Sequence, residues 1–167
     1  MQAIRLLIFT GCRRDEILTA KWHYVKRDRG VLELPDSKTG FKQIPLSVPT
    51  LDILNNLPVA EGNDYIVPGR KRGARYVGLQ DVWERIRAKA GLDDVRIHDL
   101  RHTFASHGVS SSITLPVIGG LLGHRNASTT QRYAHLQADP LKDATEIIGE
   151  KIDRAMKTEP RRLRAVK

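Results

Sequence analysis

The stretch WHYVKRDRGVLELPDSKTGFKQIPLS, residues 22–47, decides the fold class of this chain. Its short runs of β-branched and aromatic residues are separated by DRG and DSKTG, which are turn sequences. Such runs predict strands joined by tight turns, so we expect a small antiparallel sheet. The three predicted strands are residues 22–26, 31–34 and 42–46, with Lys38 at the tip of the second hairpin.

Helical patterns lie on both sides of this sheet. Residues 2–10 carry apolar side chains at helical spacing, Gly11 breaks the pattern, and residues 13–21 resume it. After the sheet we predict helices over residues 50–57, 79–90, 98–108, 114–122, 128–136 and 140–156, and a brief strand over residues 64–68. The expected fold class is α+β but mainly α, a helical domain with a small three-stranded antiparallel sheet on one side.

The charge balance indicates a polyanionic partner. The 167 residues contain 28 lysines and arginines against 19 acidic residues, which gives a formal net charge of +9. Such a surplus suits nucleic acid, although a basic protein without that partner can have the same composition.

The single cysteine, Cys12, excludes an internal disulfide framework and a multi-cysteine zinc site, so a reducing cytoplasm is the expected location. No apolar run approaches the roughly 20 residues that span a bilayer.

Arg13 follows a glycine turn in the segment TGCRRDE, residues 10–16, at the start of a predicted helix. On this segment alone it reads as a surface arginine. Glu16 lies one helical turn later, where an ion pair across three residues would hold a guanidinium in place before an anion arrives.

The segment HDLRHTFASHG, residues 98–108, places His98 and Arg101 three residues apart and therefore on one helix face. An imidazole beside a guanidinium suits phosphate binding, although a solvated helix start would also carry both. We expect His102 and His107 to lie off this face, in structural or solvent-facing positions. A zinc site is not expected, because no cysteine is near and the pattern used by zinc hydrolases is missing.

The segment LLGHRNASTTQRYAHL, residues 121–136, ends one helix at Gly123 and starts another at its Ser/Thr run. His124 lies just past the first helix, and Tyr133 about two turns into the second. A lone tyrosine on a helix is usually a core aromatic, and only its neighbours in these segments suggest a chemical role. His135 is expected to be structural.

Taken together and in this order, TGCRRDE, SKTG, HDLRHTFASHG and LLGHRNASTTQRYAHL resemble the catalytic domain of the tyrosine recombinases, the phage-integrase family. The resemblance covers residues 4–136. It departs from the family at Cys12, where leucine is usual, and at Gly119 and Gly120, which weaken a helix by about 1 kcal/mol each relative to alanine. The catalytic residues that it implies are Arg13, Lys38, His98, Arg101, His124 and Tyr133, with Glu16 in a supporting position.

The resemblance implies an enzyme that cleaves and rejoins DNA strands through a 3′-phosphotyrosine intermediate, without a metal or another cofactor. Arg13 and Arg101 would bind the scissile phosphate, and His98 would help to remove the proton of Tyr133. Two alternatives stay open: DNA relaxation like that of a type IB topoisomerase, and a truncated DNA-binding remnant without catalysis.

The expected partners are double-stranded DNA and further copies of the chain, assembled on DNA as a tetrameric synapse through the helix after Tyr133, with no membrane. Residues 1–157 would form the catalytic domain, without the family's N-terminal core-binding domain, and the basic tail 158–167 would be disordered. A bacterial or phage origin is expected. The candidates for contacts with the DNA backbone are Lys42, Arg70, Lys71, Arg72 and Arg75.

Overall fold

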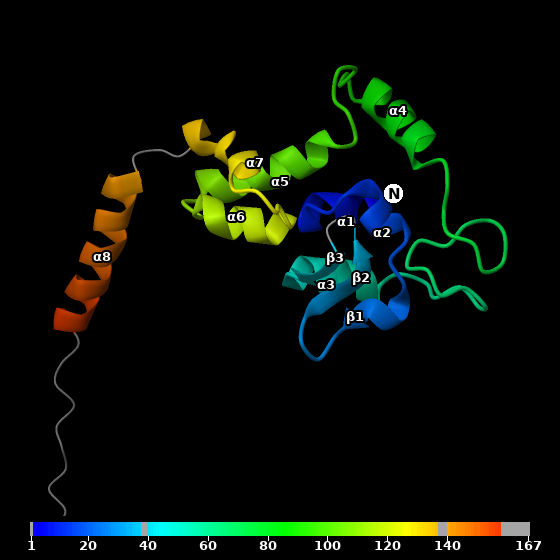
Figure 1. Cartoon of the computed structure of the whole chain (residues 1–167), viewed down its shortest axis with the longest axis horizontal. Helices are drawn as coiled ribbons and strands as arrows, with labels where there is room; N and C mark the ends of the chain where they lie inside the picture. The colour runs from blue at the N-terminus through cyan, green and yellow to red at the C-terminus, as the bar shows by residue number, and fades with distance from the viewer. Residues whose placement is uncertain (1, 38–39, 137–139, 158–167) are drawn as a thin grey trace, which may run out of the picture.

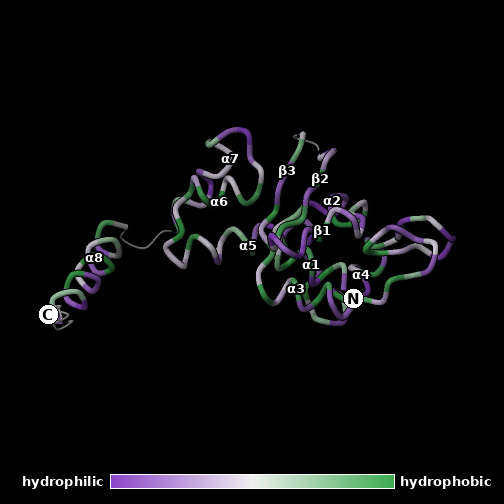
Figure 2. Tube along the Cα trace, turned by 90° about the horizontal axis from the view of Figure 1, so that it is seen from below, coloured by the Kyte–Doolittle hydropathy of each residue, from purple (hydrophilic) through white to green (hydrophobic). Residues whose placement is uncertain are grey.

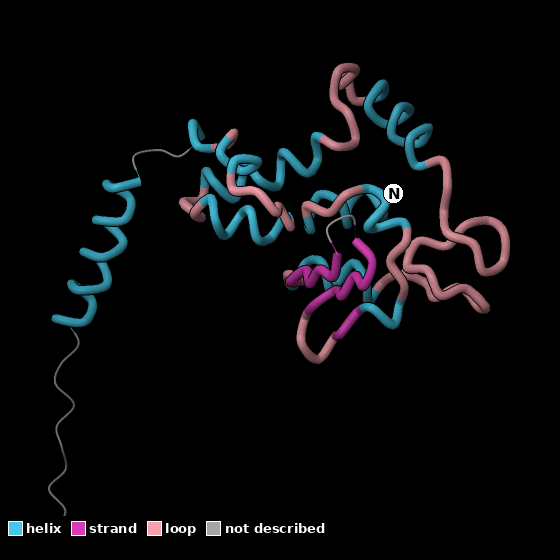
Figure 3. Tube along the Cα trace, in the orientation of Figure 1, coloured by secondary structure: helices cyan, strands magenta, loops and turns pink. Residues whose placement is uncertain are grey.

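The computed structural model describes residues 2–37, 40–136 and 140–157, so Lys38 and the predicted tail 158–167 lie outside the described residues. Figure 1 shows the arrangement of the elements, and Figure 3 colours them by type. Their order is α1 (Gln2–Thr10), α2 (Arg14–Leu18), the 3-10 helix η1 (Trp22–Tyr24), β1 (Val25–Lys26), β2 (Val31–Ser37), β3 (Gly40–Pro45), α3 (Val48–Asn55), α4 (Leu79–Lys89), α5 (Asp99–Ser110), α6 (Leu115–Leu122), α7 (Ser128–Gln131), the 3-10 helix η2 (Ala134–Leu136) and α8 (Pro140–Lys157).

The sheet is three-stranded and antiparallel in the order β1-β2-β3, which confirms the expected fold class. Leu32 pairs with Ile44, and because side chains alternate between the two faces of a strand, both point into the core. The first predicted strand is shorter than expected. Its first residues form η1, because the N–H of Tyr24 donates to the carbonyl of Lys21 at 3.0 Å and makes a turn there.

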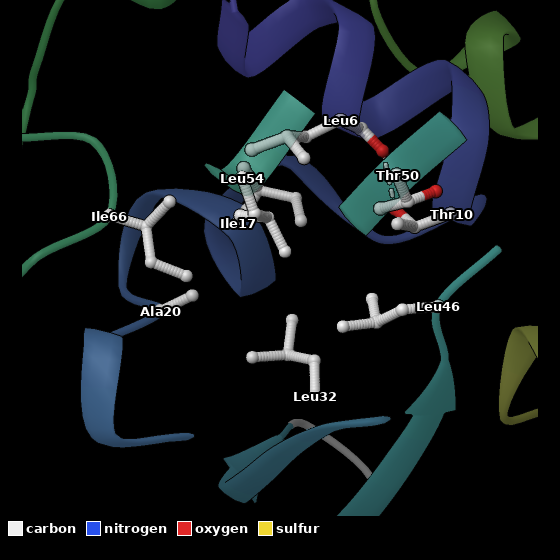
Figure 4. A pocket seen from close by; sticks show the side chains of 9 residues that line it. All are labelled: Leu6, Thr10, Ile17, Ala20, Leu32, Leu46, Thr50, Leu54 and Ile66. Carbon is white, nitrogen blue, oxygen red and sulfur yellow. Dashed lines mark hydrogen bonds between the residues drawn. The ribbon is translucent and has the colours of Figure 1, made fainter. Parts of the chain in front are cut away.

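The main hydrophobic core lies between the sheet and the helices α1, α2 and α3. Figure 4 shows side chains from these elements facing one another, with Leu32 and Leu46 on the sheet side and Leu6, Ile17 and Leu54 on the helix side. A void of only about 10 Å³ remains between them. This close packing holds the turn between α1 and α2, which contains Arg13, against the hairpin.

A second, smaller cluster joins α5, α6 and the segment after α7. Its buried members are Ala105, Val109, Ile118, Leu122 and Tyr133. These elements lie together at one side of the molecule in Figure 1. The ring of Tyr133 is therefore a core side chain, and its position is fixed by packing.

The helix predicted over residues 128–136 is interrupted in the structure. Helix α7 ends at Gln131 and η2 begins at Ala134, so Tyr133 lies between two short helical segments. The N–H of Tyr133 donates to the carbonyl of Thr130 at 3.1 Å, a tighter turn than that of an α-helix. The prediction that Tyr133 lies within an unbroken helix is wrong.

Other boundaries differ in smaller ways. Helix α2 ends at Leu18, before the predicted residue 21, and α3 starts at Val48 with a proline in its first turn, a favoured place for that residue. In place of a strand over residues 64–68 there are isolated bridges, one from Lys21 to Tyr65 and one from Pro68 to Arg75.

Helix α8 stands apart from the other helices in Figures 1 and 2. Among the residues that the structure describes, no helix has the length and apolar character needed to cross a bilayer.

Candidate active site

Arg101 joins two parts of the fold. Its side chain is buried, and its Nη1 and Nη2 atoms donate to the carbonyls of Gly11 and Leu122, each at 2.7 Å. Gly11 has a positive φ of 61°, and a Cβ there would come within 2.5 Å of the ring of Phe104. Only glycine fits, and the turn that it makes presents its carbonyl to the guanidinium.

Arg101 lies near a second cation, Arg13, and near one carboxylate, Glu16. Burial lowers the pKa of Arg101, and the nearby charge of Arg13 lowers it further. An arginine keeps its proton under such conditions, so this positive charge persists at neutral pH. Closely spaced guanidinium groups repel one another, and a bound anion relieves that repulsion. The arrangement suits a phosphate.

Glu16 holds Arg13 in place. One carboxylate oxygen accepts from the backbone N–H of Arg13 at 2.8 Å, and the other accepts from its Nη1 at 2.9 Å. The first bond is the reciprocal half of a capping box, which fixes the start of α2. The expected contact across three residues is therefore present, and the side chain of Arg13 keeps 27% of its surface exposed for a ligand.

Lys42 completes this ion-pair group from the hairpin. Its Nζ donates to Glu16 at 3.1 Å, and both side chains are buried. The sequence interpretation placed Lys42 on the surface as a candidate for the DNA backbone, whereas the structure places its ammonium inside. The missed signal is the two-residue alternation with Ile44 and Leu46, which assigns Lys42 to the inward face of the sheet.

His124 follows the end of α6. Gly123 has a left-handed φ of 68°, and the N–H of His124 returns to the carbonyl of Gly119 at 2.9 Å, which ends the helix in a Schellman motif. Burial lowers the pKa of His124 to about 4, and the charges of Arg101 and Arg13 add to the effect. The imidazole is neutral at pH 7, so it can donate to a phosphate only through a tautomeric N–H.

Thr130 sets the orientation of that imidazole. Its Oγ1 lies 2.8 Å from His124 Nδ1, and the threonine side chain is buried. A Cβ at Gly119 would come within 2.9 Å of this oxygen, whereas a Cβ at Gly120 would meet open space. Gly119 therefore allows the close approach of α7 to α6 that brings Thr130 to His124. If the hydroxyl donates to Nδ1, the proton of the ring stays on Nε2, which faces away.

Replacement of Thr130 by valine tests this arrangement. The shape is kept and the hydroxyl is lost, so we expect the DNA cleavage that the sequence resemblance implies to slow by about tenfold, as for one hydrogen bond of about 1.4 kcal/mol. The matched variant Thr130→Ser keeps the hydroxyl and is expected to stay close to the wild type. The measurement is the rate of covalent adduct formation on nicked DNA, and equal rates for both variants would contradict the role of the hydroxyl.

Tyr133 packs against α5 and is buried. Only 6% of it is exposed, burial raises its pKa, and its hydroxyl lies 2.5 Å from the Nδ1 of His102. The ring of His98 meets that of His102 edge-on, with centroids 5.2 Å apart. Burial lowers the pKa of His98, and His102 and Arg101 lower it further.

The contact of His102 with Tyr133 corrects the sequence interpretation, which placed His102 off the face of His98. The four-residue spacing of these histidines is the signal that could have found it, because residues i and i+4 share a helix face. His107 and His135 are exposed.

The structure brings Arg13, His98, Arg101, His124 and Tyr133 into one electrostatic neighbourhood with Arg101 at its centre. The remaining candidates lie elsewhere. The loop of residues 69–75 carries four of them, Arg70, Lys71, Arg72 and Arg75. Arg72 packs against Gly62, and the guanidinium of Arg75 lies 3.9 Å from the carboxylate of Asp15.

Similarity to known proteins identifies the family of this chain. The model of the phage integrase family matches residues 1–139. Tyrosine recombinase XerA of Pyrococcus furiosus is 32% identical over 150 residues, which cover 86% of this chain and 52% of that protein. The chain thus spans about half the length of the curated relatives that it matches.

Solved structures agree with the sequence relatives. XerH site-specific recombinase bound to its difH substrate matches with a TM-score of 0.67 and 25% identity, over 87% of this chain and 44% of that one. The catalytic domain of bacteriophage HP1 integrase matches with a TM-score of 0.65 and 26% identity, over 87% of this chain and 79% of that one. Since the family model spans most of its length, the chain belongs to the phage integrase family of tyrosine recombinases.

Proposed function

We propose that this chain is the catalytic domain of a site-specific DNA recombinase, which cleaves and rejoins DNA strands through a covalent bond to Tyr133. The observation that carries the proposal is the positive neighbourhood of Arg101, which contains a second arginine, a neutral histidine and the tyrosine. Strand exchange through a phosphotyrosine needs such a site, because the attacked phosphate gains negative charge in the transition state.

Each residue has a proposed part in the reaction. Arg13 and Arg101 bind the non-bridging oxygens of the scissile phosphate through their remaining N–H groups. His124 donates a further hydrogen bond from Nε2. Tyr133 gives its phenolic proton to a neighbouring histidine and attacks phosphorus, the bond to the 5′ oxygen breaks, and a 3′-phosphotyrosine forms. Lys38 is proposed to protonate the departing oxygen. The energy of the broken bond stays in the new linkage, so a second DNA hydroxyl can reverse the step without a metal or ATP.

The proposal extends to the domain and its surface. Residues 1–157 are assigned to the catalytic domain, which would work in the cytoplasm. The four cations of the loop 69–75 are proposed to contact the DNA backbone, since exposed arginines and lysines neutralise phosphates. The relatives reported above are named recombinases and an integrase, which favours recombination over topoisomerase-like relaxation.

Trapping of the covalent intermediate tests the proposed function. The full chain is incubated with duplex DNA from its own genomic flanks, nicked so that the short fragment with the new 5′ hydroxyl diffuses away after cleavage. We expect a covalent complex whose proteolytic digest carries the nucleotide on Tyr133 through a 3′ phosphate. Failure to form a covalent complex with DNA that the chain binds would contradict the catalytic assignment and support the DNA-binding remnant.

Helix α8 is proposed to mediate self-association on DNA, as part of a tetrameric synapse. Its described side chains are all exposed, and an apolar stripe follows one face at helical spacing, made by Leu141, Ile148, Ile152 and Met156. An apolar groove of about 420 Å³ between α1, α5 and α6 has a matching character and is proposed to receive this stripe from a second copy. Its lining includes Ile8, Phe9, Phe104, Ile113, Ile118 and Leu121.

Two neighbouring isoleucines give a matched test of this association. Ile148 lies in the stripe, while Ile147 lies about 100° around the helix from it. We expect Ile148→Glu to weaken assembly on DNA by about 30-fold, the effect of losing one buried side chain of about 2 kcal/mol. Ile147→Glu should assemble like the wild type. The size of the DNA complex is measured against protein concentration, and equal losses in both variants would contradict the assignment of the face.

A further inference from the structure

The hydroxyl of Tyr133 has a specific partner, His102, that the sequence interpretation missed. It lies 2.5 Å from Nδ1 of His102, and the two rings are tilted by 49° with centroids 5.9 Å apart. A separation at the short end of the hydrogen-bond range places the phenol and the imidazole within reach of direct proton transfer.

Packing fixes this contact from both sides. The tyrosine ring is held in the small cluster with Ala105 and Val109 of α5 and with Ile118 and Leu122 of α6. His102 belongs to α5, which carries Arg101 as the preceding residue. The same helix therefore holds the proposed phosphate-binding guanidinium and the partner of the phenol, in consecutive positions.

Burial and the nearby charges determine whether His102 is protonated. Burial lowers its pKa below the ordinary 6.5, and the nearby Arg132, Arg96 and Arg101 lower it further, while Asp99 acts in the opposite direction. The ring of His98, at the N-cap of α5, contacts the ring of His102 edge-on. At neutral pH the imidazole is unprotonated, so Nδ1 can offer a lone pair to the phenol. Burial raises the pKa of Tyr133, so attack at neutral pH requires a proton acceptor.

We propose that His102 is a catalytic residue that accepts the phenolic proton of Tyr133 at Nδ1 during strand cleavage. The O–H bond of the phenol breaks and its proton moves to Nδ1, the phenolate oxygen forms the bond to phosphorus, and the bond to the 5′ oxygen breaks as that oxygen is protonated. In the rejoining step the imidazolium returns the proton to the tyrosine. His98, which the sequence interpretation gave this part, then positions His102 through the edge-on contact. The inference rests on the function proposed above.

The pH dependence of cleavage by the full chain distinguishes proton transfer from a structural role. Single-turnover adduct formation on nicked DNA is measured for the wild type, His102→Gln and the control His135→Gln, an exposed histidine two residues from the nucleophile. We expect the wild-type rate to fall as the pH drops through the pKa of His102, below 6.5. His102→Gln should be slower by about a hundredfold or more and should lack this acid limb, with DNA binding unchanged.

A chemical rescue completes the test. Free imidazole should restore part of the rate in His102→Ala and none in Tyr133→Phe. A His102→Gln variant that cleaves within about threefold of the wild type, or that keeps the acid limb, would overturn this inference alone, since the wild-type adduct would still support the proposed function. Absence of the adduct in the wild type would instead overturn the proposed function itself.

Discussion

Tyr133→Phe is expected to abolish covalent adduct formation on nicked DNA and to leave DNA binding close to that of the wild type. The phenyl ring keeps its place in the small cluster, because only the hydroxyl is removed from a side chain that packs through its ring. The loss of the hydrogen bond to His102 costs about 1 kcal/mol of stability, too little to unfold a domain. The chemistry fails because no nucleophile remains.

Tyr76→Phe is the matched control. Tyr76 is partly buried against the main core, so the same loss of a hydroxyl occurs away from Arg101. We expect wild-type adduct formation in this variant. Adduct detected with Tyr133→Phe, at a rate similar to that of Tyr76→Phe, would show that another residue attacks the phosphate.

Glu16→Gln is expected to cause the largest loss of stability among the substitutions considered. The ammonium of Lys42 would remain buried without a compensating charge, and breaking a buried ion pair in this way costs about 3–5 kcal/mol. The guanidinium of Arg13 would also lose its ionic partner. The measurement is the free energy of unfolding by urea, together with the rate of DNA cleavage under conditions where the variant is folded.

Two companion variants make this test specific. Glu33→Gln removes a surface ion pair with Arg29 and should lose far less stability, because water screens that pair. The double variant Glu16→Gln with Lys42→Met removes both buried charges and should recover most of the loss, but not the positioning of Arg13. A Glu16→Gln variant as stable as Glu33→Gln would contradict the role of the buried pair.

The stability of the domain in acid should depend on the carboxylate of Glu16. Burial alone would raise the pKa of Glu16, but the charge of Lys42 and the hydrogen bonds from Arg13 outweigh it, so the pKa is lowered from its ordinary 4.5. The stabilisation is therefore present above about pH 4.5 and is lost as the pH falls through the lowered pKa. Glu16→Gln should flatten this acid dependence, which denaturant titrations at several pH values measure.

Local patterns predicted those parts of the fold that depend on neighbouring residues. The two turn sequences and the branched runs between them determine the hairpins, and apolar spacing determines α1, α4 and α6. The break at Tyr133 was not predictable in this way. It depends on the cluster with Val109 and Ile118, which are remote in sequence, and tertiary packing overrides a helical pattern there.

The candidate site was predictable as a set of residues and not as a set of contacts. Motif order identified Arg13, Arg101 and His124, but the partners that hold them come from other elements. The inward face of Lys42 was readable from strand alternation, whereas the contact of Thr130 with His124 depends on how closely α7 approaches α6. The sequence interpretation treated Gly119 as a weakness of its helix. The structure shows it as the position that permits that approach.

The placement of Tyr133 among apolar side chains sets a limit on engineering of this domain for heat tolerance. Larger residues at Ala105 or Val109, which are both fully buried, would crowd the cluster and press on the ring. Their bulk would also restrict the ring, which must reach the phosphorus atom in the proposed reaction. Variants selected for thermostability in this cluster should therefore turn over more slowly, while those selected around Leu32 and Leu54, in the main core, should not.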